Sequence, residues 1–173
     1  LYKHAQWFED TGESLTPERV DFQGAFEMIQ QGWQQPDSVY VNLWASEGIY
    51  DNNAQRMAFY MQLVYLGETR SDFSTGWDIY TLIYLQERLL SKAMNEDWGA
   101  MAATLGFGEY DQPPTEISGN DFLLISASFL LEQDLRPLFS AWGIDYGSDA
   151  SDQVDAYGLL PADSLFYAAT DVN

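Results

Sequence analysis

The sequence predicts a mainly α-helical protein, a compact bundle of about six to eight helices with room for one short strand pair. Apolar residues recur at helical spacing in several segments, helix start and stop signals flank these segments, and strand-like alternation is rare and short. A chain of 173 residues can bury a real core, so we expect residues 1–173 to form a single helical domain.

The first helix with a clear start signal follows Thr16-Pro17-Glu18. Threonine can accept a hydrogen bond from a free backbone amide, proline fits the first helical position, and glutamate suits the positive end of the helix dipole. The apolar stripe of this helix consists of Phe22, Phe26, Ile29 and Trp33. Residues 38–44 ("SVYVNLW") then alternate weakly and are the candidate for a short strand.

Two longer helices are expected next. Residues 52–67 form the first, which ends at Gly67 and has an apolar face made of Met57, Tyr60, Met61 and Val64. Residues 77–94 form the second, whose broad apolar face consists of Ile79, Leu82, Ile83, Leu89 and Leu90. We expect this second helix to run through the core.

The following part combines a loop and a buried helix. After a short helix at residues 97–105, the glycines and prolines of residues 106–121 predict a loop, and loops of this length often border functional surfaces. Residues 121–132 are almost continuously apolar or small. This pattern predicts a central helix that is contacted on several sides.

The segment "DLRPLFSAWGI", residues 134–144, contains both ends of a short helix. Pro137 lies in the first turn, Asp134 lies near its positive end, and Gly143 follows Trp142 where a left-handed residue is expected. A short acidic helix at residues 149–157 comes next, and residues 164–170 ("SLFYAAT") could end the chain as a strand.

The charge balance excludes several classes of partner. With 27 acidic and 7 basic residues, a net charge of -20 repels polyphosphates and anionic lipids, so we expect neither nucleic acid nor membrane surfaces as partners. No apolar run approaches the length of about 18 residues that a membrane span needs. Because the chain has no cysteine, disulfide and thiolate chemistry are also excluded.

The familiar catalytic motifs are missing. His4 is the only histidine, so a zinc site rich in histidine or cysteine cannot be built from this chain alone. Asp149, Asp152 and Asp155 recur every three residues and could attract a cation, but they lack the spacing of a calcium loop, and we interpret them as solvated acids. No H-E-x-x-H sequence or phosphate-binding loop is present.

The residue types allow two hypotheses that involve sugars: hydrolysis of a glycosidic bond and stacking of sugars on aromatic rings. A glycosidase needs two carboxylates about 5–9.5 Å apart, and the candidates here are Glu47, Asp51, Asp78 and Asp121. In so acidic a chain a candidate pair is expected by composition alone, so this is the weaker hypothesis. The aromatic rings could stack on sugars, but Trp33, Trp77 and Trp142 lie in or beside apolar segments, and we predict that they pack in the core.

Three phrases occur in a fixed order: residues 55–67 ("QRMAFYMQLVYLG"), residues 76–89 ("GWDIYTLIYLQERL") and residues 134–144, the last preceded by the helical residues 117–133. Together they resemble the helical part that follows the zinc motif in enhancin-like metallopeptidases, the mucin-degrading gluzincins that include the accessory colonization factor type. The resemblance covers most of residues 1–157 and is best from Gln55 onward.

The resemblance implies a secreted or surface-anchored zinc endopeptidase that acts on mucin-like glycoproteins, with H-E-x-x-H and a downstream glutamate as ligands. This chain lacks H-E-x-x-H, and the nearest match to the phrase with the third ligand has Ser38 where a glutamate is needed. We therefore assign no zinc ligand and no catalytic residue. We expect the chain, which starts at Leu1 without methionine, to be the C-terminal helical portion of such an enzyme. The zinc would be held by the parent protein and not by this part, which alone would be inactive.

The expected partners are an upstream catalytic domain of the same chain and a mucin-like glycoprotein substrate. The candidates for the substrate cleft are Trp77, Asp78, Arg136 and Trp142. Arg136 could instead pair bidentately with a carboxylate and fix its helix. The alternative function is a non-enzymatic helical module that binds glycan or protein through exposed aromatic side chains.

Overall fold

The computed structural model describes residues 53–162, with side chains from Arg56 onward. This part contains six α-helices and a 3₁₀ turn: α3 (Asn53–Gly67), α4 (Asp78–Glu96), α5 (Trp98–Met101), η1 (Ala103–Leu105), α6 (Gly119–Leu131), α7 (Arg136–Ala141) and α8 (Ser148–Ala156). The predicted mainly α-helical class is confirmed. None of these helices is both long and apolar enough to cross a membrane.

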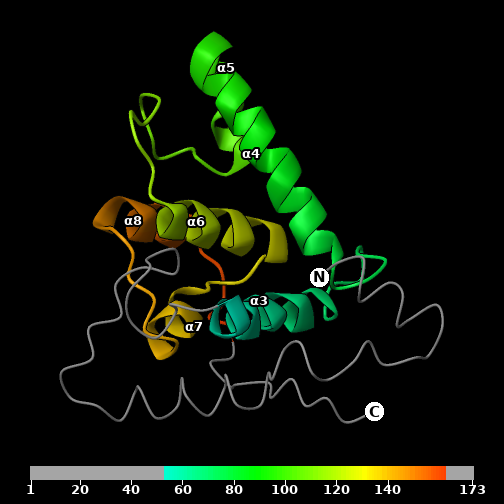
Figure 1. Ribbon diagram of the computed structural model, residues 1–173. Helices are drawn as coiled ribbons and strands as arrows, with labels where there is room; N and C mark the ends of the chain where they lie inside the picture. Colours follow the sequence, from blue (N-terminus) through cyan, green and yellow to red (C-terminus); the bar gives the residue numbers. More distant parts are fainter. Residues whose placement is uncertain (1–52, 163–173) are drawn as a thin grey trace, which may run out of the picture.

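Helix α6 occupies the centre of the fold (Figure 1), where it packs against α4, α8 and α3. Ser118 caps its start by accepting a hydrogen bond from the backbone N–H of Asp121 at 3.1 Å. Its buried residues lie on several sides of the helix: Asn120, Leu123, Leu124, Ile125, Ser126, Ala127, Ser128 and Leu131. The prediction of a central helix contacted on several sides is confirmed.

Helix α3 has the predicted extent but a different buried face. Its core-facing side carries Phe59 and Leu63, both 0% exposed, whereas Met57 and Met61 are only half-buried. The predicted face was therefore right only in part: Val64 is buried and Tyr60 packs against the core. The sequence of α3 places apolar side chains on nearly every side of the helix. Periodicity alone therefore cannot tell which of two apolar faces is buried.

The end of α3 depends on a close approach between two glycines. Gly67 ends the helix as predicted, but it is not in the left-handed conformation expected of a C-terminal cap. A Cβ atom on Gly67 would lie 2.7 Å from the carbonyl oxygen of Gly76, and one on Gly76 would lie 2.1 Å from the carbonyl oxygen of Val64. Two residues without side chains let the start of α4 pack against the end of α3.

Helix α4 packs on the core with one side only. Its buried residues are Ile79, Gln86, Leu90 and Ala93. Leu89, which we predicted to face the core, is 44% exposed, so the expectation that this helix runs through the core was wrong. The buried amide of Gln86 donates a hydrogen bond to the carbonyl of Leu105 at 2.6 Å and so fixes η1 against α4.

Helix α7 begins and ends as the sequence predicts. Pro137 lies in its first turn, and Gly143 has the left-handed φ of 63°. Asp134, just before the helix, forms an isolated parallel bridge with Pro161. Its N–H donates to Leu160 at 2.9 Å, and its carbonyl accepts from Ala162 at 2.8 Å. Within residues 53–162 this bridge is the only strand-like pairing; the helix expected after Thr16 and the strands expected at residues 38–44 and 164–170 lie outside this range.

Candidate functional site

Trp77 and Asp78 form the start of α4. The Asp78 carboxylate accepts hydrogen bonds from the backbone N–H groups of Ser74 at 2.6 Å and Thr75 at 3.2 Å. A carboxylate at a helix N-terminus also interacts favourably with the helix dipole. Trp77 is 8% exposed, and its ring lies 6.2 Å from that of Tyr80. Both candidates therefore have a structural role in this turn.

Arg136 joins α7 to α8. Its guanidinium donates to both carboxylate oxygens of Asp134, at 2.9 and 2.8 Å, and to Asp155 at 3.0 Å. A further donor lies 3.3 Å from the carbonyl of Ser151 in α8. The structure therefore shows the bidentate pairing that the sequence allowed, a geometry that arginine makes especially well.

The pair of Asp134 and Arg136 shifts the titration of both groups. Burial alone would raise the pKa of Asp134, but hydrogen bonds from the side chain and backbone of Arg136 outweigh it, and the pKa lies below its usual value. Hydrogen bonding to Asp134 raises the pKa of Arg136, although partial burial opposes this. Both groups are therefore held in their charged forms at neutral pH.

Trp142 is fully buried at the end of α7. A row of rings connects it to Trp77, with centroids of neighbouring rings about 6 Å apart: Trp77–Tyr80 at 6.2 Å, Tyr80–Tyr60 at 5.8 Å, Tyr60–Phe59 at 6.3 Å and Phe59–Trp142 at 5.6 Å. The two tryptophans thus lie at opposite ends of one aromatic row that crosses α3, as expected for core packing. A direct contact of any of the four cleft candidates with substrate remains a prediction.

The predicted loop borders a groove of about 500 Å³ beside α4. We call it the α4 groove; its lining residues are Glu87, Leu90, Ser91, Met94, Asn95, Pro113, Pro114, Thr115, Ile117, Gly119 and Phe122. The apolar members include the buried Leu90 and the half-buried Ile117 and Phe122. Polar side chains also line it, so the groove combines apolar surface with hydrogen-bonding groups, as many ligand sites do.

Our sequence analysis did not single out the polar residues of this groove. Glu87, Ser91 and Asn95 follow one another at intervals of four and therefore lie on one face of α4. That spacing was a usable signal, but it was hidden by the stronger apolar pattern of the same helix. The amide of Asn95 donates to the carbonyl of Ser91 at 2.6 Å.

Several carboxylates accept hydrogen bonds or form ion pairs within the fold. Asp121 accepts a hydrogen bond from the N–H of Gly147 at 2.8 Å, and Asp155 pairs with Arg136. Burial and the negative charges of Asp121 and Asp149 raise the pKa of Tyr110 to about 12. Among residues 53–162, no group of three or more His, Cys, Asp or Glu side chains is arranged to hold a metal ion.

The chain is similar to a known metalloprotease over its whole length. The chain is 38% identical over 183 aligned residues to the immunomodulating metalloprotease of Pseudomonas aeruginosa, and the alignment takes in 100% of this chain but 20% of that protein. No protein-family model matches the chain.

The solved structures agree with the sequence comparison. The IMPa metallopeptidase of Pseudomonas aeruginosa matches 96% of this chain with a TM-score of 0.80 and 38% identity. Two further structures, IMPa in complex with an O-glycopeptide and the metallopeptidase in complex with T-antigen, match with the same TM-score at 37% identity. In each case this chain spans about a fifth of the length of the protein it matches.

Proposed function

We propose, on the premise that this chain is homologous along its whole length to a segment of a metallopeptidase, that it is the helical portion of a secreted or surface-anchored zinc endopeptidase acting on mucin-like glycoproteins. The similarity agrees with the metallopeptidase class predicted from the three sequence segments. In our proposal the helices support the catalytic part of the enzyme, and the α4 groove forms one wall of the substrate cleft.

The observation that carries this proposal is the similarity of both sequence and fold to the same metallopeptidase, one structure of which contains an O-glycopeptide. The groove supplies compatible chemistry. Its apolar surface can pack against peptide side chains or sugar faces, while Glu87, Ser91 and Asn95 can exchange hydrogen bonds with hydroxyl and amide groups. A cleft wall for a glycosylated peptide needs both kinds of contact.

The part of the chain that the structure describes offers no site for the metal of such an enzyme. The residues described here do not fit a zinc site, because they contain no suitable group of ligands, and His4 lies outside them. In a metallopeptidase the zinc polarises a water molecule and the substrate carbonyl. We assign no step of that chemistry to this chain and propose only positioning and substrate contact for it.

The test is the hydrolysis of a synthetic O-glycopeptide by the full-length gene product, with and without a metal chelator. We expect hydrolysis that the chelator abolishes and that added zinc restores. We also expect Ser91→Arg, which places a bulky side chain in the α4 groove, to raise KM for the glycopeptide, while Gly99→Ala on open surface leaves it unchanged. Absence of chelator-sensitive hydrolysis in the wild-type protein would contradict the enzymatic proposal.

The same glycopeptide also tests the alternative function, a non-enzymatic module that binds glycan or protein. A glycan- or protein-binding module would bind the glycopeptide without cleaving it, and Ser91→Arg would then weaken binding alone. Calorimetric titration of the glycopeptide in the presence of the chelator separates this outcome from catalysis.

A further inference from the structure

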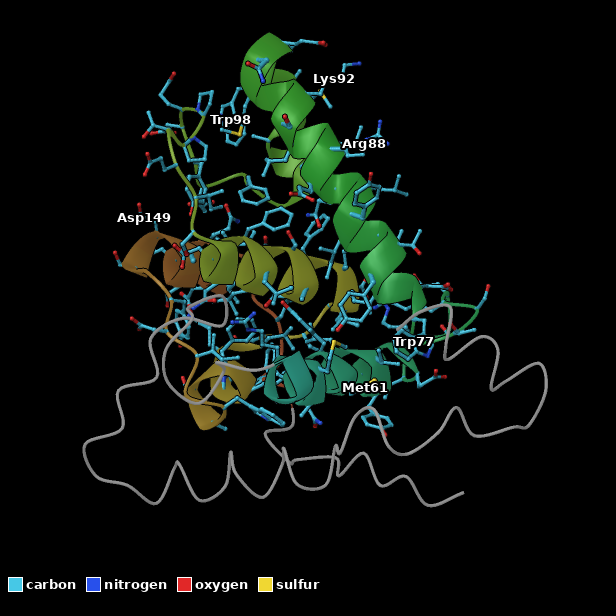
Figure 2. All side chains as sticks on the ribbon, viewed as in Figure 1. Met61, Trp77, Arg88, Lys92, Trp98 and Asp149 are labelled. Carbon is cyan, nitrogen blue, oxygen red and sulfur yellow. The ribbon has the colours of Figure 1, made fainter. Side chains whose placement is uncertain are left out.

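One side of α4 exposes large apolar side chains. Tyr84 is 56% exposed, Leu85 47% and Leu89 44%, and they are three of the four large hydrophobic residues that are exposed in the described part of the chain. Arg88 and Lys92 lie on the same side of the helix, pointing away from α6 (Figure 2). We call these five residues the α4 outer stripe.

The spacing of the stripe is that of a helix-packing face. Residues 84, 88 and 92 follow one ridge of the helix, and residues 85 and 89 follow the next. The core-facing side of α4 is already filled by Ile79, Leu90 and Ala93, which lie on its opposite face. The stripe therefore adds nothing to packing within the described part, and a contiguous exposed apolar patch of this kind typically marks a contact surface.

The charges on the stripe differ from those elsewhere in the fold. Arg70 and Arg136 each donate to two carboxylates, whereas Arg88 lies over the ring of Tyr84 at 5.8 Å. Lys92 is 3.7 Å from Glu96 of the same helix, and both side chains are more than half exposed, so this pair is weak. In a protein with a net charge of -20, the stripe is an apolar surface with two basic side chains, and Glu96, which follows Lys92 on the same ridge, places a carboxylate beside it.

These features select one kind of occupant. A second copy of the chain carries the same charge of -20 and is repelled as it approaches. The homologous metallopeptidase, in contrast, contains about four-fifths of its length beyond the matched segment, which is ample to cover this face. We propose that the α4 outer stripe is where another part of the same longer polypeptide packs, presenting apolar side chains flanked by carboxylates. This inference rests on the proposed function, because it requires the longer protein.

The test uses thiol labelling of the full-length gene product. This chain has no cysteine, so Leu89→Cys reports on the stripe, and Leu160→Cys, at a residue that is 82% exposed and outside the stripe, is the matched control. Peptide mass spectrometry measures the labelling rate at each site. We expect Cys at 89 to react at least about tenfold more slowly than Cys at 160 in the native protein, and equally fast in denaturant.

A second pair of variants tests the charge complementarity. In the Leu89→Cys background, Arg88→Glu with Lys92→Glu should speed labelling, whereas the charge-preserving pair Arg88→Lys with Lys92→Arg should not. Labelling at 89 as fast as at 160 would overturn the proposal, and so would protection that disappears on dilution, because that result indicates a second copy. Protection at 89 in a protein without chelator-sensitive hydrolysis would support the docking and contradict only the enzymatic role.

Discussion

Helices α6 and α4 are both rich in apolar residues, but the fold uses them differently. Eight of the 13 residues of α6 are buried, against four of the 19 residues of α4. The difference follows from their neighbours: α6 lies between α4, α8 and α3, whereas the outer stripe of α4 has no neighbouring helix among the described residues. The number of apolar residues in a helix therefore does not predict how many of them are buried within the fold.

Truncation of an apolar side chain should destabilise the protein far more in α6 than on the outer stripe of α4. Ile125→Ala removes a side chain that is 0% exposed in α6 and should lower the free energy of unfolding by about 2–5 kcal/mol. Leu89→Ala, a similar truncation on α4, should change it by less than about 0.5 kcal/mol in the 173-residue chain. Urea unfolding followed by circular dichroism measures both. Equal losses for the two variants would contradict the contrast.

An intermediate effect is expected where the start of α4 meets the end of α3. Gly76→Ala places a Cβ atom 2.1 Å from the carbonyl oxygen of Val64, and the resulting strain should cost about 1–3 kcal/mol. Gly99→Ala is the matched control, because nothing lies within 4 Å of its Cβ position and alanine is the better helix former. Thermal unfolding should therefore show opposite shifts, and a neutral Gly76→Ala would refute the close approach of the two helices.

A smaller loss of stability is expected at Asp134, whose contact with Arg136 lies outside α4 and α6. Asp134→Asn should cost about 1 kcal/mol at neutral pH, because it removes the negative charge that Arg136 contacts. The folded-state pKa of Asp134 is lowered, so its contribution is present above the unfolded-state pKa and is lost as the pH falls through the folded value.

Unfolding in urea at about pH 7 and at about pH 3 checks the sign of this effect. We expect the difference between the wild-type and Asp134→Asn proteins to shrink at the lower pH. A difference of the same size at both pH values would show that the carboxylate charge does not contribute. Arg136→Lys should reproduce part of the loss, since a lysine cannot make the bidentate contact.

Local signals predicted the helices well. The ends of α3 and α7 follow from Gly67, Pro137 and Gly143, whereas α6 begins at Gly119, before the predicted start at residue 121. These signals act within a few residues of one another, so a sequence contains them directly. The resemblance to a metallopeptidase, based on the order of three segments along the chain, was confirmed by the sequence comparison.

The faces of α3 and α4 were predicted only in part: on α4, Ile79 and Leu90 are buried as expected, but Leu89 is exposed. Both helices carry apolar residues on more than one side, and the choice between sides depends on packing against elements distant in sequence, such as Phe59 against Phe139 and Gln86 against Leu105. The α4 groove was missed because it requires a loop to lie beside a helix. Of the cleft candidates, Arg136 was recognised as a possible helix clamp, but its partner Asp155 lies in another helix and could not be identified from spacing.

The bridge between Asp134 and residues 160–162 has one more consequence. The same residue holds Arg136 through its carboxylate and the chain at Leu160 and Ala162 through its backbone. The polypeptide therefore departs from the helices at an anchored point, without slack between α8 and residue 162. The connection from Gly158 to Leu159 is thus held at both ends, by the last turn of α8 and by the bridge to Asp134, so an insertion there should be absorbed locally and leave Asp134 paired.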